Sequence, residues 1–434
     1  MKTLYTNAVV LTPDGKYIKN GCVAHDGGII TYVGDETGAP DGYVRYDCHS
    51  GLLSPAFYNI HCHAAMTLFR GVGEDLPLDR WLNEKIYPAE DRLTPESVRI
   101  GSLLAAAEMI RGGVVSFSDM YFMCDETARV VLDTGMKANI SRCLVSFDED
   151  ADVKNDDRFN EAVALVNEYH NAGDGRLKID MSVHAEYTNK AKYCRGVADY
   201  AHANSLGLQV HVSETKLETE ECKARNHGKT PTEFLAETGI LVPTERSTTT
   251  AAHCVWLTEH DIELMRELRV NVAHNPVSNL KLASGVAPLK KLLDANINVG
   301  LGTDGAASNN KLSILRELQL AALLHKGVNL SADIIPTNTI CTLAQRSGAL
   351  AQGRYDCGEL KAGNRADFIL IDLDAINNIP MYDPYYALAF SVNPDDIRLT
   401  VCDGRVLYEN GEYKTLDIEK LKAEAKPILE HYFD

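Results

Sequence analysis

Two histidines separated by a single residue give the sequence its clearest chemical signal. They are His61 and His63, within the segment Asn59–His63 (NIHCH). Residues two apart in a β-strand project to the same face, so the two imidazoles could bind one metal ion. Zinc accepts imidazole nitrogen, and a catalytic zinc has about three protein ligands and one open position. An HxH pattern is common by chance, so its meaning depends on what other parts of the chain bring to it.

Three further segments with a strand-like pattern end in groups of the same chemical kind. His211 and Glu214 stand at the end of one, His253 at the end of another, and Asp304 just after a third. Chance explains any one of these residues on its own. The complete set of three strand ends with His, His and Asp, together with the HxH segment, instead favours one metal centre. Active sites of barrel enzymes lie at the carboxyl ends of the strands.

The elements that must position these residues alternate between strand-like and helix-like patterns. Helices are predicted between most strands, for example over 96–111 and 259–268, where Thr258 and Asp261 have capping-box spacing. Eight such units predict a (β/α)₈ TIM barrel in an α/β protein. A doubly wound sheet is the alternative, but no GxGxxG or GxxxxGK[ST] motif follows a strand. The eight predicted strands are Phe57–His61, Val114–Ser118, Lys137–Cys143, Leu177–His184, Leu208–Val212, Thr248–His253, Val270–His274 and Ile297–Gly302.

Both ends of the chain have short alternating strands that the middle lacks. Examples are 366–373 and 399–408, followed by the hairpin turn signal Asn410-Gly411. We therefore expect a small composite β-sandwich domain made of 1–53 plus 356–434, and a catalytic barrel over 54–355.

Charge and cysteine content exclude several classes of protein. The 434 residues include 43 Lys and Arg against 61 Asp and Glu, a net charge of −18. This excess of negative charge argues against nucleic acid or an anionic membrane as a partner. The 11 cysteines lack a CxxC pair and predict reduced, buried thiols. We expect a cytoplasmic protein without a signal peptide or membrane span.

Three long segments carry a resemblance to a known family. They are 61–92 (HCHAAMTLFRGVGEDLPLDRWLNEKIYPAEDR), 273–289 (AHNPVSNLKLASGVAPL) and 301–310 (LGTDGAASNN). The order HxH, His, His, Asp is similar to that of the mononuclear deaminases of the amidohydrolase superfamily. Within it, the chain resembles the S-adenosylhomocysteine / 5′-methylthioadenosine deaminase family over nearly its whole length.

The resemblance implies a set of metal ligands and proton-transfer groups. It implies one divalent metal ion per subunit, with zinc expected, although three histidines and an aspartate also suit iron or manganese. Glu214 would be the proton shuttle, and His253 would hold the attacking water, with Asp304 as the third catalytic group. The implied metal ligands are His61, His63, His211 and Asp304.

It also implies a substrate and the residues that contact it. The expected reaction is hydrolytic deamination of the 6-amino group of an adenine nucleoside, such as S-adenosylhomocysteine, 5′-methylthioadenosine, 5′-deoxyadenosine or adenosine. A small-molecule substrate and a homo-oligomer, a dimer or tetramer, are expected as partners. The implied substrate contacts are Glu90, Arg142, His184, Glu214 and Asp304, and Ser308 lies in a matching segment.

The residues leave several alternatives open. Glu186 stands where the family often has proline, and a carboxylate pointing into the pocket would disfavour an anionic 5′ group. Such a group would require arginine, from Arg142 or a neighbouring subunit's Arg158. A methylthio group would require apolar residues such as Met66. The same site could instead hydrolyse a triazine, pterin, guanine or cytosine, or belong to a barrel without turnover, although Glu90 favours a ribose and Glu214 favours catalysis.

Overall fold

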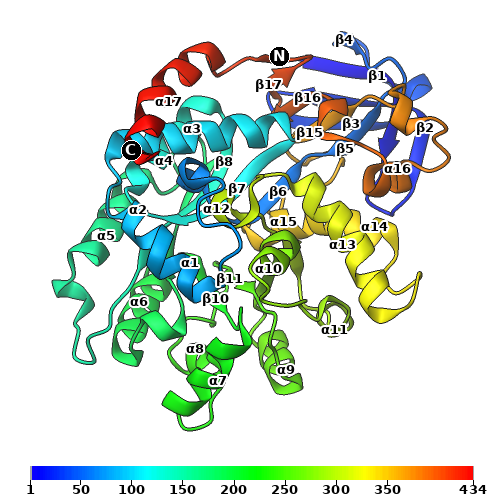
Figure 1. Ribbon diagram of the computed structural model, residues 1–434. Coiled ribbons are helices and arrows are strands. Elements are labelled where there is room, and N and C mark those ends of the chain that lie inside the picture. Colours follow the sequence, from blue (N-terminus) through cyan, green and yellow to red (C-terminus); the bar gives the residue numbers. More distant parts are fainter. Residues whose placement is uncertain (1, 434) are drawn as a thin grey trace.

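The computed structural model describes residues 2–433 and consists of a barrel and a β-rich unit beside it (Figure 1). This confirms the predicted (β/α)₈-type barrel with a β-rich companion. The barrel strands run parallel and carry their helices on the outside (Figure 1). They are β6 (Phe57–His63), β7 (Val114–Tyr121), β8 (Lys137–Leu144), β9 (Leu177–Val183), β10 (Leu208–Val212), β11 (Thr249–His253), β12 (Asn271–His274), β13 (Val299–Leu301) and β14 (Asp304–Gly305).

The eighth barrel strand is split in two, and the split closes the barrel. Its first half, β13, pairs with β12, and its second half, β14, pairs with β6. Between them, Thr303 N donates to His61 O over 3.1 Å. Asp304, at the start of β14, has a left-handed backbone with φ 60°. The strand is therefore interrupted at Gly302 and Thr303, directly before the residue that is expected to bind the metal.

Helix boundaries follow the capping residues of the sequence. Thr258 caps α9 and exchanges hydrogen bonds with Asp261, as its spacing predicted. The α-helices are α1 (Leu78–Trp81), α2 (Tyr87–Glu90), α3 (Pro95–Arg111), α4 (Cys124–Thr134), α5 (Asp157–Tyr169), α6 (Ala191–Ala203), α7 (Lys216–Arg225), α8 (Pro231–Glu237), α9 (Glu259–Glu267), α10 (Pro276–Lys281), α11 (Leu289–Asp294), α12 (Ala306–Asn309), α13 (Ile314–Asn329), α14 (Thr337–Ala344), α15 (Arg346–Ala351), α16 (Pro384–Phe390) and α17 (Ile418–Phe433). A π-helical turn, η3 (Leu82–Ile86), joins α1 to α2, and 3₁₀ turns are η1 (Glu36–Gly38), η2 (Ala64–Phe69), η4 (Val153–Asn155), η5 (Glu186–Thr188), η6 (Ile376–Asn378) and η7 (Pro394–Asp396).

The β-rich unit is one hydrogen-bonded sheet made from both ends of the chain. At its centre, β15 pairs antiparallel with β5, which joins a C-terminal strand to an N-terminal one. One face packs Tyr5 and Phe368 into a core of its own, and the other packs Leu52 and Ile369 into the core that the barrel shares. Its strands are β1 (Lys2–Leu11), β2 (Tyr17–Asp26), β3 (Ile29–Asp35), β4 (Val44–Asp47), β5 (Leu52–Pro55), β15 (Phe368–Ile371), β16 (Ile397–Cys402), β17 (Arg405–Glu409) and β18 (Glu412–Tyr413).

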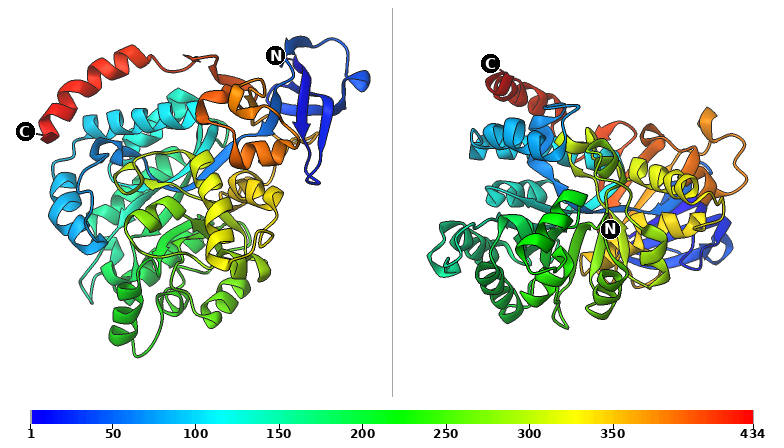
Figure 2. Two further views of the ribbon diagram at one scale, coloured as in Figure 1. Left: turned by 45° about the vertical axis from the view of Figure 1, so that its right-hand side comes forward. Right: turned by 60° about the horizontal axis from the view of Figure 1, so that its bottom comes forward.

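The C-terminal helix α17 leaves the sheet and lies along the barrel. Figure 2 shows it running away from the N-terminal strands to the far side of the molecule. Leu421 and Ala425 pack against Ile100 and Ala107 of α3. Sequence reasoning placed this segment in the β-rich unit only and did not predict its contact with the barrel.

The 11 cysteines are all buried and free, as predicted. In the part of the chain that the structure describes, no helix is long and apolar enough to span a membrane.

A buried lysine links the amino-terminal ends of the barrel strands to the β-rich sheet. Lys137, at the start of β8, forms ion pairs with Asp367, and with Asp403 over 2.8 Å. Tyr58 of β6 donates to the same Asp367 carboxylate over 2.6 Å. Burial alone would lower the pKa of Lys137, but these carboxylates outweigh it and raise that pKa, so the lysine is charged.

Replacing Lys137 with methionine is expected to lower the free energy of unfolding by about 3–5 kcal/mol, because it leaves buried carboxylates without their cation. Chemical denaturation measures this loss. The control is Lys290→Met on α11, where an exposed pair with Asp294 is lost and a change below about 0.5 kcal/mol is expected. Equal losses in the two variants would contradict a stabilising role for the buried pair.

Candidate active site

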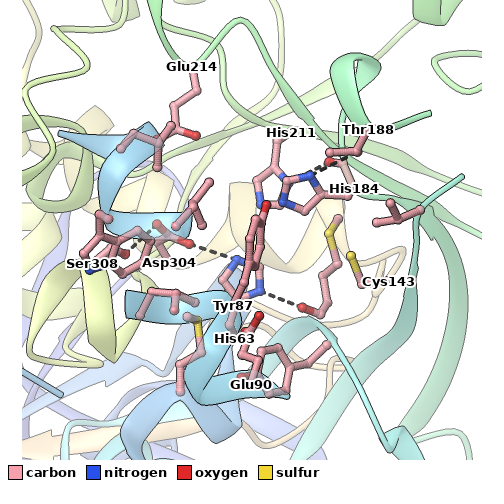
Figure 3. Close-up of a pocket in the computed structure, with 18 of the residues that line it drawn as sticks. His63, Tyr87, Glu90, Cys143, His184, Thr188, His211, Glu214, Asp304 and Ser308 are labelled. Carbon is pink, nitrogen blue, oxygen red and sulfur yellow. Dashed lines mark hydrogen bonds and ion pairs between the residues drawn. The ribbon is translucent and has the colours of Figure 1, made fainter. Parts of the chain in front are cut away.

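A cavity of about 210 Å³ opens at the carboxyl ends of the barrel strands and collects most of the site residues that the sequence predicted (Figure 3). His61 lies just behind the lining, with Nε2 3.4 Å from Asp304 Oδ1. Ser308 also lines the cavity. The predicted residues that line it are His63, Glu90, His184, His211, Glu214, His253 and Asp304.

The four predicted metal ligands lie together with His253, which was predicted to hold the attacking water. Ligand-type atoms of His61, His211, His253 and Asp304 all lie within 4.8 Å of one another. The fifth group, His63, places Nε2 3.0 Å from the same Asp304 Oδ1. Geometry alone therefore offers five donors, one more than a tetrahedral site uses.

Hydrogen bonds on the outer nitrogens fix how three of the histidines face the centre. Nδ1 of His63 lies 2.6 Å from Met120 O, and Nδ1 of His211 lies 2.7 Å from His184 O. Nδ1 of His253 lies 2.8 Å from Asn279 Oδ1. With these oxygens as acceptors, each Nδ1 carries a proton, and Nε2 is the nitrogen that each ring would offer to a metal ion.

Asp304 is held so that only one of its oxygens faces the histidines. Ser278 Oγ donates to Oδ2 over 2.7 Å, and Ser308 Oγ donates to the same oxygen over 2.6 Å. Oδ1 is left for His61 and His63. Such hydroxyl contacts orient a metal-binding carboxylate from behind.

The donor set fits a divalent metal ion. Burial lowers the pKa of His61 to about 4 and the pKa of His211 well below its usual range, so both rings are neutral near pH 7. Nε2 of His61 is buried and lacks a hydrogen-bond partner among the described groups. A buried acceptor without a donor costs free energy, and a metal ion would use its lone pair.

Glu214 is held above this centre as a buried carboxyl group. Its Oε1 accepts from Ser284 Oγ over 3.3 Å, and its Oε2 lies 3.8 Å from His253 Nε2. The Glu218 carboxylate caps α7 and accepts from Glu214 N over 2.7 Å, which fixes the backbone. Burial raises the pKa of Glu214, a condition that suits a group that must carry a proton near pH 7.

Glu90 lies at the opposite side of the cavity from Glu214 (Figure 3). It ends α2, and burial raises its pKa to about 7 against the opposing effect of the Tyr121 hydroxyl. His184 lines the wall between strands, with Nδ1 3.2 Å from Thr188 Oγ1. A ligand that fills the cavity can therefore contact a carboxyl group at each end.

Two charged residues that sequence reasoning placed near the substrate point elsewhere. Arg142 is absent from the described cavity lining, and its Nε donates to Glu161 Oε2 over 2.8 Å on the helix side of β8. Glu186 is buried away from the cavity, where it accepts from Arg225 and Asn226 of the α7 end. The Glu186 carboxylate therefore does not point into the cavity.

Several residues that support the site were missed from the sequence. Three of them form hydrogen bonds to side chains of the site: Ser278 to Asp304, Asn279 to His253 and Ser284 to Glu214. All three lie in the segment 273–289 that carries the family resemblance. Asp119, at the end of β7, accepts from Ala64 N over 2.6 Å directly after the HxH segment. Their position in a matching segment or at a strand end was the available signal.

Comparisons with known proteins identify the family of the chain. The chain is 40% identical over 427 residues to a 5-methylthioadenosine/S-adenosylhomocysteine deaminase from Dictyoglomus thermophilum, covering 98% of each chain. It is 41% identical over 430 residues to a 5′-deoxyadenosine deaminase from Methanosarcina acetivorans, covering 98% of this chain and 96% of that one. The crystal structure of an adenosine deaminase from Xanthomonas campestris with bound zinc has a TM-score of 0.93 and 30% identity, covering 99% of this chain and 98% of that one. Residues 52–407 match the Amidohydrolase family, and the chain belongs to that family.

Proposed function

We propose that this protein is a metal-dependent deaminase that hydrolyses the 6-amino group of an adenine nucleoside to the inosine analogue and releases ammonia. One observation carries the proposal most directly. The cavity places the buried carboxyl group of Glu214 beside the histidine and aspartate cluster, and Glu90 faces it from the other side. The names of the relatives support an adenine nucleoside as the substrate class.

The residues proposed to hold the metal are His61, His63, His211 and Asp304, and zinc is the proposed ion. A zinc-bound structural neighbour at 30% identity supports this choice, as does the nitrogen-rich donor set. A divalent ion held there would supply a water molecule acidic enough to act as a nucleophile near pH 7.

The side chains around the cluster account for the proton movements. Glu214 donates a proton to N1 of the purine, so that negative charge does not build up on the ring as water adds to C6. His253 accepts a hydrogen bond at Nε2 and orients the attacking water. Asp304 accepts one proton from the water and passes it to the amino group, which leaves as ammonia when the C6–N bond breaks. The second proton, on the oxygen added at C6, returns to Glu214 as the C6 carbonyl forms. Water is consumed, and no oxidant or reductant is needed.

The proposal is tested by following purine absorbance with metal-loaded protein and adenosine, 5′-deoxyadenosine and 5′-methylthioadenosine. A decrease at the adenine maximum, with one ammonia released per nucleoside, is the expected result. A lack of change with all three nucleosides, in protein that has bound its metal, would overturn the proposal.

Glu90 is proposed to bind the ribose hydroxyls, which predicts a substrate-dependent effect of Glu90→Gln. Hydrogen bonds to a charged group contribute about 1.5–3 kcal/mol. The variant is therefore expected to lower kcat/KM for a ribonucleoside by about tenfold or more. Steady-state kinetics with 5′-deoxyadenosine measures the loss.

The matched control for this prediction is a substrate rather than a second variant. A 2′,3′-dideoxy adenine nucleoside lacks the hydroxyls that Glu90 would bind, so wild type and Glu90→Gln are expected to process it at similar rates. An equal loss on both substrates would show that the substitution acts through the cavity wall and not through the ribose.

We also infer that the protein forms a homo-oligomer, a dimer or tetramer. The support is the resemblance to the deaminase family described above. Light scattering coupled to size-exclusion chromatography tests it, and a monomeric mass across a range of concentrations would contradict it.

A further inference from the structure

A buried carboxyl group lies behind the site, on a helix outside the cavity lining. Glu317, on α13, is fully buried and does not belong to the described lining of the cavity. Burial raises its pKa to about 8 against the opposing effect of its hydrogen bonds. Among the described residues no basic side chain forms an ion pair with it, and the adjacent Arg316 donates to Asn309 instead. A buried carboxyl group without a cation is costly, so the hydrogen bonds that offset this cost show what Glu317 holds in place.

The Glu317 carboxylate joins two short helices. Its Oε2 accepts from Val277 N of α10 over 3.0 Å, and its Oε1 accepts from Asn309 Nδ2 of α12 over 2.7 Å. The same Asn309 amide donates to Thr303 O over 2.7 Å, directly before Asp304. One side chain of α13 therefore connects both helices with the end of the split eighth strand.

The two helices carry the hydroxyl groups that orient Asp304. Ser278 of α10 and Ser308 of α12 both donate to Asp304 Oδ2, and Figure 3 shows Ser308 beside this carboxylate. Val277 directly precedes the first serine, and Asn309 directly follows the second. A shift of either helix would change a hydrogen bond to Oδ2 and turn Oδ1 relative to the histidines.

From these contacts we infer that Glu317 is a positioning residue, which orients Asp304 toward the metal ion by holding α10 and α12 together. The inference rests on the metal centre proposed above and adds a group that neither binds the ion nor contacts the substrate. Groups that orient a ligand from behind typically contribute 10–100-fold to metal affinity or activity. An apolar side chain of the same size would fill the space but would bind neither helix.

The first experiment replaces Glu317 with glutamine, which keeps the size of the side chain. Its single oxygen can accept from only one of the two donors, Val277 N or Asn309 Nδ2. Zinc affinity, measured by titration with a chelating dye, is expected to fall by about tenfold. In excess zinc, kcat for 5′-deoxyadenosine should fall by a similar factor with KM unchanged, because Glu317 lies outside the cavity lining. Wild-type affinity and kcat in the folded variant would overturn the inference.

A destabilised variant at the other end of the barrel separates positioning from stability. Lys137→Met removes the buried cation there and should keep wild-type zinc affinity and kcat at temperatures where it is folded. The visible spectrum of bound Co²⁺, which depends on coordination geometry, should change in Glu317→Gln and not in Lys137→Met. Equal losses of zinc affinity in the two variants would overturn the inference. If wild-type protein binds no divalent metal ion, the proposed function itself fails instead.

Two further variants test the route from Glu317 to Asp304. Asn309→Ala removes the link to α12 while keeping the carboxyl group, so unchanged zinc affinity in this variant would also overturn the inference, even if Glu317→Gln failed to fold. In a protein that carries both Ser278→Ala and Ser308→Ala, Glu317→Gln is expected to add little to the loss, since all three substitutions act on the same carboxylate oxygen. Additive losses would contradict this route.

Discussion

Replacing Glu214 with glutamine is expected to lower kcat by about 10²–10⁴-fold, the usual contribution of a general acid or base. The amide keeps the size of the side chain and can still accept from Ser284 Oγ, but it cannot carry the proton that N1 of the purine requires. Metal content should stay at the wild-type level, because Glu214 is proposed as a proton carrier and not as a ligand. Absorbance assays measure kcat, and elemental analysis of the same preparation measures the metal content.

A surface glutamate on the helix that follows Glu214 provides the control for this prediction. Glu220 lies on α7, its side chain is 63% exposed, and its pair with Lys216 spans 3.7 Å. Glu220→Gln is expected to keep wild-type turnover. If Glu214→Gln also kept most of its turnover, the proton carrier would have to be another group in the cavity.

Replacing His63 and His253 separately with alanine should decide which of them completes the metal site. His63 shares Asp304 Oδ1 with His61, whereas His253 faces Glu214. His63→Ala is therefore expected to lower metal affinity by more than 100-fold, since losing even a hydrogen-bond partner of a ligand costs about 10–100-fold. His253→Ala should keep its metal and lose turnover.

Both variants are compared by titration with a metal-binding dye and by kcat in excess metal. His325→Ala is the control histidine, because its ring pairs with His274 over 3.0 Å outside the described cavity lining. Loss of metal from His253→Ala with full retention by His63→Ala would reverse the assignment. Because the cluster offers five possible donors, His253 could take the place of His63 as a ligand, and the experiment distinguishes the two arrangements.

Most of the barrel could be predicted because its strands are short apolar segments bounded at both ends by turn-forming or helix-capping residues. Leu208–Val212 agrees residue for residue with β10, and the other strands differ by a few residues at their ends. The eighth strand was the exception. Its predicted span, 297–302, differs from β13 and β14 because hydrophobic pattern does not indicate where a strand changes its partner.

The direction of individual side chains was the part that a single sequence could not provide. Strands of a parallel barrel are covered on both faces, so neighbouring residues look alike in polarity. In β8, Cys143 lines the cavity, while the preceding Arg142 points toward α5. The predicted contact of Arg142 with substrate came from the resemblance, and the cavity lining does not include it.

Residues that support the ligands were also beyond sequence reasoning, because their role depends on contacts between distant segments. The role of Ser278 can be recognised only in the folded structure, where α10 places its hydroxyl group beside Asp304. Lys137 carries no visible motif, yet the fold surrounds it with carboxylates from the far end of the chain. Patterns within a segment predict elements, while such pairs require the assembled structure.

The split eighth strand has a consequence for how the protein folds. The bond from Thr303 N to Asn59 Oδ1 joins positions 244 residues apart, and Asp304 reaches the histidines only when this last seam forms. Contacts between such distant positions form slowly, because a long loop must close first. Metal capture by the refolding chain would therefore mark the final step, and a stopped-flow signal from the bound ion would time the completion of the barrel rather than its collapse.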